Sequence, residues 1–94
     1  MIVWTEQAVR QLDQAHDYIA LSNSKEVAAR IALQIVTNIQ QLAAFPVSGR
    51  LGRVPGTREL VISGTPFIAA YAVEKACVVI LAIYHGAQRW PEAF

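Results

Sequence analysis

The first half of the chain contains two successive stretches with the apolar spacing of amphipathic helices. Thr5 is a candidate N-cap, and the apolar stripe after it predicts a helix that runs to about Leu21. After a short polar break, Ser24 is the candidate N-cap of a second helix that ends at Phe45-Pro46. Helices joined by so short a break form an antiparallel hairpin. The stripes consist of Ala8, Leu12, Ala15 and Ile19 in the first helix, and of Ala28, Ile31, Ile35, Ile39 and Leu42 in the second.

The second predicted helix has apolar residues beside its main stripe as well. Ala29, Leu33 and Val36 lie on this flank, so the helix is apolar over a wider arc than one packing neighbour requires. We therefore expect it to contact two neighbours.

Strand-like patterns stand on both sides of the helical region. A short apolar run at residues 1–4 predicts a strand before the first helix. Residues 46–57 form a predicted loop with three glycines and two prolines. Alternating or continuous apolar runs then predict strands at residues 58–62, 67–73 and 77–84, joined by tight hairpin connections.

This order of elements predicts a single α+β domain over residues 1–94. An N-terminal strand and an antiparallel helical hairpin pack on a mainly antiparallel sheet, in the order β-α-α-β-β-β. The strand at residues 77–84 is apolar on both faces, so we expect it in the interior of the sheet.

The composition of the chain bears on whether the protein has a binding partner and on where in the cell we expect it. Apolar residues make up 54% of the chain and charged residues 16%, with a net charge of +1. So few charges suggest that part of the apolar surface lies against a partner. The longest apolar run, residues 76–84, is far shorter than the ~20 residues of a membrane span. No signal-peptide pattern is present and Cys77 is the single cysteine, so we expect a cytoplasmic protein.

Few residues offer catalytic or metal chemistry. His16, Cys77 and His85 lack the spacing of metal ligands, so we expect neither a metal nor another cofactor. Glu59 and Glu74 stand alone on predicted strands, which gives no pair of catalytic carboxylates.

The arginines of the glycine-rich loop are more informative. Arg50, Arg53 and Arg58 alternate with glycines, so guanidinium groups lie on a loop whose backbone can approach a ligand closely. Such a cluster suits a phosphate or a carboxylate, and a merely solvated loop is the alternative.

The end of the last predicted strand is a second candidate site. Tyr84 and His85 are adjacent and therefore point to opposite faces of an extended strand. His85 is a candidate acid, base or phosphate ligand, or else a structural hydrogen-bonding residue. Arg89-Trp90 follows in the tail at residues 86–94.

Short motifs are spread along nearly the whole chain. In chain order they are Val3-Trp4, Pro46, Gly49-Arg50, Thr57-Arg58-Glu59-Leu60, Pro66-Phe67-Ile68, Tyr71-Ala72-Val73, Ile80-Leu81-Ala82-Ile83-Tyr84-His85 and Arg89-Trp90-Pro91. Together they resemble the motifs of RelE/ParE superfamily toxins from bacterial toxin–antitoxin systems. The resemblance implies the fold predicted above, growth inhibition and plasmid stabilisation. It also implies a small antitoxin, encoded beside the toxin, that binds it as a hetero-oligomer.

The resemblance also implies one of two targets. RelE-like members cleave messenger RNA on the ribosome with positively charged, tyrosine and histidine side chains, whereas ParE-like members poison DNA gyrase. Arg58 matches an arginine of both branches. His85 matches a position where some RNases have a catalytic histidine, and Tyr84 stands beside it. The RNase branch typically has a second arginine three residues before the tyrosine matched by Tyr71. Ile68 stands there instead and cannot neutralise a transition-state phosphate.

We therefore predict a type II toxin closer to the ParE branch. The alternatives are an mRNA endoribonuclease and a family member that has lost its toxicity. The catalytic candidates of the RNase are Arg58, Tyr84 and His85, and those for binding the target or a phosphate are Arg50, Arg53, Arg58, Arg89 and Trp90. The predicted antitoxin footprint is the flank Ala29, Leu33 and Val36, together with the less covered face of the sheet.

Overall fold

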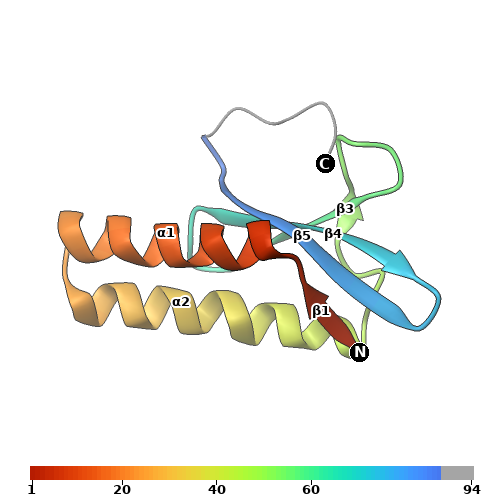
Figure 1. Ribbon diagram of the computed structural model, residues 1–94, viewed down its shortest axis with the longest axis horizontal. Helices are drawn as coiled ribbons and strands as arrows, with labels where there is room; N and C mark the ends of the chain where they lie inside the picture. The colour runs from red at the N-terminus through yellow and green to blue at the C-terminus, as the bar shows by residue number, and fades with distance from the viewer. Residues whose placement is uncertain (88–94) are drawn as a thin grey trace.

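The computed structural model describes residues 1–87 and contains two helices packed against a five-stranded sheet (Figure 1). The elements in chain order are β1 (Ile2–Trp4), α1 (Glu6–Ser22), α2 (Lys25–Gln40), the 3-10 turn η1 (Gln41–Ala43), β2 (Arg50–Leu51), β3 (Arg58–Val61), β4 (Phe67–Glu74) and β5 (Cys77–His85). The predicted α+β fold and helical hairpin are confirmed. No helix within residues 1–87 has both the length and the apolar character needed to cross a membrane.

Both helices begin at the N-caps that the sequence predicts. The Thr5 hydroxyl accepts a hydrogen bond from the Ala8 amide at 3.1 Å, and the Ser24 hydroxyl accepts one from the Val27 amide at 3.1 Å. These bonds satisfy amides that have no partner inside the helix. Thr5 also donates its hydroxyl hydrogen to the Leu81 carbonyl at 3.1 Å, so the same side chain joins the start of α1 to β5.

The strand order is β1-β5-β4-β3-β2, with β1 parallel to β5 and every other pair antiparallel. The predicted interior position of the last strand is confirmed, because β5 lies between β1 and β4. The interpretation of residues 46–57 as a loop throughout is wrong, since β2 lies inside that segment. Its two residues pair with β3, Arg50 opposite Glu59 and Leu51 opposite Arg58. A strand of two residues is too short to show a hydrophobic period.

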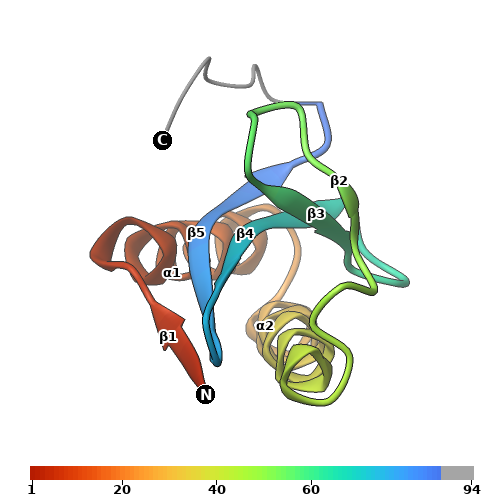
Figure 2. The ribbon, with the colours of Figure 1, turned by 90° about the vertical axis from the view of Figure 1, so that its right-hand side faces the viewer.

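The two faces of the sheet have separate buried clusters. The face toward the helices holds Tyr71 with the main core, whereas the opposite face holds Ala70, Ala82 and Tyr84. Leu81 is an extra residue in β5 that shifts the register with β4. Ala82 therefore pairs with Ala70 on the face away from the helices, while Ile80 pairs with Tyr71 on the helix side. We expected the second face to be less covered, but its centre is buried. The segment between β2 and β3 rises on this side of the sheet (Figure 2).

The pairing of β3 with β4 divides the loop arginines between the two faces. Arg58 pairs with Tyr71 and so lies on the helix side, while Glu59 pairs with Ala70 on the opposite side. Arg50, opposite Glu59, shares its face. The predicted arginine cluster is therefore split by the sheet.

Candidate functional site

A buried carboxylate organises the part of the arginine cluster that lies away from the helices. Glu59 has a side chain only 2% exposed, and its Oε1 accepts a hydrogen bond from Arg50 Nε at 3.1 Å and lies 3.0 Å from Arg50 Nη2 in an ion pair. Its Oε2 accepts the backbone N–H of Arg53 at 3.0 Å and lies 3.8 Å from that residue's Nε. The partners of Glu59 are therefore arginines, which the sequence pattern did not assign to it.

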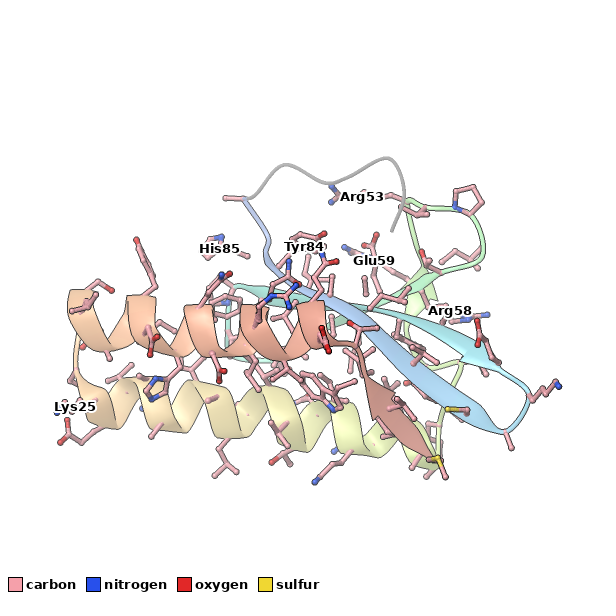
Figure 3. All side chains as sticks on the ribbon, in the orientation of Figure 1. Lys25, Arg53, Arg58, Glu59, Tyr84 and His85 are labelled. Carbon is pink, nitrogen blue, oxygen red and sulfur yellow. The ribbon has the colours of Figure 1, made fainter. Side chains whose placement is uncertain are left out.

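This Glu59 cluster (Glu59, Arg50 and Arg53) carries one negative and two positive charges, a net of +1. A buried carboxylate is stable only when it is paired and hydrogen-bonded, and both conditions are met here. Both arginine side chains remain 54% exposed. Figure 3 shows Arg53 and Glu59 on the side of the sheet away from the helices. The cluster therefore presents two fixed guanidinium groups, with half of their charge neutralised within the protein.

Arg58 lies in a different environment on the helix side of the sheet. Its Nη1 donates to the carbonyl oxygens of Gly49 at 2.8 Å and Val47 at 3.3 Å. The amide of Gly49 in turn donates to the Tyr71 hydroxyl at 2.9 Å. A glycine is needed here, because a Cβ would lie 2.6 Å from the Tyr71 hydroxyl oxygen and 2.7 Å from the carbonyl oxygen of Glu59. Tyr71 and Gly49 thus position the carbonyls that hold Arg58.

Tyr84 and His85 face opposite sides of β5, as the sequence predicts. Tyr84 is 7% exposed within the cluster on the second face. The His85 ring meets Phe67 edge-on with centroids 5.6 Å apart, and its Nδ1 accepts the Ala87 amide at 3.1 Å. That bond places the proton of the neutral ring on Nε2. His85 also lines a hollow of about 410 Å³ between α1 and the ends of β4 and β5.

The three residues of the RNase hypothesis are not brought into one site. Arg58 of β3 and Ile80 of β5 both pair with Tyr71 of β4, so they lie at the same level along the strands. His85 is therefore roughly 15 Å further along the strand direction and roughly 10 Å across two strand spacings. Arg58 and Tyr84 point to opposite faces of the sheet, and Figure 3 shows Arg58 and His85 near opposite ends of it.

Two groups of predicted residues remain, the flank of α2 and the pair in the tail. On α2, Leu33 is 66% exposed, Ala29 is exposed and Val36 is partly buried, so this flank is open to a partner. Arg89 and Trp90 lie outside the described residues. Within residues 1–87, no group of three or more histidine, cysteine or carboxylate side chains is arranged to hold a metal ion.

Comparison with known proteins places the chain in a family. Residues 2–90 match the family model described as the ParE toxin of the type II toxin–antitoxin system parDE. The chain belongs to the ParE toxin family. It is therefore a type II toxin of the RelE/ParE superfamily, near ParE, as the sequence motifs predict.

Two curated relatives and one solved structure resemble the chain over most of its length. A putative toxin, Y4kP of Sinorhizobium fredii, is 41% identical over 91 residues, which cover 97% of this chain and 93% of the relative. Toxin RelE2 of Caulobacter vibrioides is 37% identical over 87 residues, covering 93% and 96%. A chain from the chromosomal ParDE system of Pseudomonas aeruginosa superposes with a TM-score of 0.83 at 30% identity, over 89% of this chain and 92% of that one.

Proposed function

We propose that this ParE-family toxin arrests bacterial growth by binding DNA gyrase, and that an antitoxin encoded by an adjacent gene neutralises it. The separation of the candidate RNase residues is the observation that supports a protein target rather than an RNA target. Arg58, Tyr84 and His85 are divided between two faces of the sheet, and Tyr84 is buried. An RNA phosphate reaches several side chains only when they converge on one point.

The surfaces proposed for binding follow from the charges and exposure already described. Arg50 and Arg53 are held by Glu59 with their guanidinium groups half exposed, so they offer a rigid cationic contact for the target. The α2 flank of Ala29, Leu33 and Val36 offers an apolar contact for the antitoxin. The toxin would act in the cytoplasm, where gyrase works, and be stored as a toxin–antitoxin hetero-oligomer.

A supercoiling assay with purified toxin and gyrase tests the target. We expect inhibited supercoiling and trapped cleavage complexes at toxin concentrations near that of the enzyme. Supercoiling that is unaffected, with no trapped complexes, would refute gyrase as the target. Expression of the toxin alone should arrest growth, and normal growth would instead indicate a member that has lost its toxicity.

An mRNA endoribonuclease is the second candidate, favoured by the 37% identity with a relative named Toxin RelE2. Primer extension on messenger RNA with ribosomes distinguishes the two functions, since new cleavage ends appear only for an RNase. For the proposed gyrase inhibitor we expect an unchanged pattern.

The antitoxin surface is tested by Leu33→Glu, with Leu21→Glu as the matched control. Both residues are exposed helix leucines, at 66% and 90%, but Leu21 lies at the far end of α1. We expect Leu33→Glu to weaken rescue of growth by the co-expressed neighbouring reading frame and Leu21→Glu to leave it intact. Equal rescue of both variants would exclude the α2 flank from the interface.

A further inference from the structure

Arg58 is held rigidly while one edge of its guanidinium stays open. Within residues 1–87 its hydrogen bonds to protein both leave from Nη1, to the carbonyls of Val47 and Gly49. The guanidinium has five N–H donors in a planar fork. The edge formed by Nε and Nη2 has no acceptor in the described part of the chain. This edge has the geometry that binds a carboxylate through two parallel hydrogen bonds.

A hollow of about 220 Å³ lies beside Arg58, and we call it the Arg58 pocket. Its other lining residues are Leu51, Gly56, Thr57 and Val73, and none of them is charged. Leu51 is 80% exposed and Val73 is 40% exposed, so the rim is apolar and open to a partner. Among residues 1–87, the pocket thus offers a single cation in an apolar rim.

The neighbouring arginines do not add charge to this pocket. Arg50 and Arg53 are paired with Glu59 on the opposite face of the sheet. A nucleic-acid backbone is bound through several cations that together release counterions. One guanidinium between apolar side chains instead complements a single carboxylate with apolar neighbours. An acidic segment of a peptide provides such a carboxylate.

The strand next to the pocket provides a place for such a segment. β2 is the last strand in the sheet order. The amide of Gly52 donates to the carbonyl of Thr57, on the side of β2 that faces β3. Successive residues of a strand direct their backbone N–H and C=O groups to alternate sides, so those of Leu51 point to the outer edge. An extended peptide beside Leu51 can therefore pair with the backbone and reach Arg58 with a side chain.

We propose that the Arg58 pocket receives an aspartate or glutamate side chain from an extended segment of the antitoxin, with apolar residues of that segment covering Leu51 and Val73. This inference rests on the proposed function, because it names the contact through which the antitoxin holds the toxin. It assigns Arg58 to a protein carboxylate rather than to an RNA phosphate.

Fluorescence anisotropy with labelled peptides, tiled across the polypeptide of the neighbouring reading frame, tests the pocket. We expect one contiguous peptide to bind the toxin, and Arg58→Gln to weaken it roughly 10- to 100-fold, the range for a lost charge-assisted hydrogen-bond pair. Replacing the peptide's carboxylate with its amide should cause the same loss. The two changes together should cost no more than either alone, because they remove one interaction.

Leu51→Glu gives an independent variant, since its exposed side chain leaves the hydrogen bonds of Arg58 in place. A carboxylate on the rim repels the acidic peptide and competes for Arg58, so binding should again fall about tenfold or more. Leu21→Glu, at a leucine on α1 that is also largely exposed, should bind like the wild type. A decamer of single-stranded RNA serves as the phosphate probe and should show no dependence on Arg58.

Three results would overturn the inference while leaving the proposed function intact. They are peptide binding that neither Arg58→Gln nor Leu51→Glu weakens, additive losses for the arginine and carboxylate changes, and RNA binding that Arg58→Gln abolishes. If the wild-type toxin forms no complex at all with the neighbouring gene product, the antitoxin part of the proposed function fails, and the inference fails with it.

Discussion

The role of Glu59 can be tested with Glu59→Gln, which removes the charge and keeps the shape of the side chain. The carboxylate accepts hydrogen bonds from Arg50 Nε and from the backbone amide of Arg53, and forms an ion pair with Arg50 Nη2. A glutamine has one acceptor oxygen, so its NH₂ group must face either the guanidinium or the amide, donor against donor. At least one of the bonds that hold the loop between β2 and β3 is therefore lost.

The size of the expected loss of stability depends on how deeply Glu59 and its two arginine partners are buried. A hydrogen bond to a charged group contributes about 1.5–3 kcal/mol, and Glu59 itself is almost fully buried. The arginines are 54% exposed and can turn toward water after the substitution, which reduces the penalty. We therefore expect Glu59→Gln to lower the free energy of unfolding by about 2 kcal/mol. For a domain of this size that corresponds to a fall in Tm of roughly 8–16 °C.

Thermal unfolding followed by circular dichroism measures this loss, with Glu74→Gln as the control. Glu74 is exposed at the end of β4 and has no ion pair with another described residue, so its neutralisation should change stability by less than about 0.5 kcal/mol. Hydrogen exchange gives a local readout, because the Arg53 amide should lose its protection in Glu59→Gln. Equal Tm values for the two variants, with Arg53 still protected, would falsify the account of the Glu59 cluster.

Three further substitutions test the contacts that shape the site and the start of α1, each through the midpoint of urea unfolding. Tyr71→Phe leaves the buried Gly49 amide without an acceptor and should cost about 1–3 kcal/mol, whereas a wild-type midpoint would mean that water replaces the hydroxyl. Gly49→Ala places a Cβ against Tyr71 and the Glu59 carbonyl and should cost at least about 1–3 kcal/mol, a prediction contradicted by a silent substitution. Thr5→Ala removes an N-cap and a bond to Leu81 and should cost about 1–2 kcal/mol, while Thr5→Ser retains the hydroxyl and most of the stability.

The helical half of the fold follows from local sequence signals. Thr5 and Ser24 are polar residues just before apolar stripes, and each bonds an amide three residues ahead. The information for such a cap lies within one helical turn, so the sequence alone suffices. The interior place of β5 was also predictable, because a strand apolar on both faces must be covered on both.

The site depended on information that the sequence does not carry locally. Whether Glu59 meets Arg50 depends on the pairing of β2 with β3, and β2 has only two residues. The charged residue inside an apolar strand was a signal that Glu59 needed a partner, but several arginines were candidates for it. The hydroxyl of Tyr71 reaches Gly49 across 22 residues of sequence, a contact that no spacing rule predicts.

The sheet separates the loop arginines, with Arg50 and Arg53 on one face and Arg58 on the other. This separation explains how so few charges can serve two different contacts. On the face away from the helices, Glu59 fixes Arg50 and Arg53 and leaves the cluster with a net charge of +1. On the helix side, Arg58 keeps its whole charge and is oriented by neutral carbonyls instead of a carboxylate. Arg58 attracts a partner's carboxylate more strongly than the Glu59 cluster does, because no carboxylate within residues 1–87 is paired with it. An antitoxin that binds there would interact with the one loop arginine that the toxin has not already paired with a carboxylate within residues 1–87.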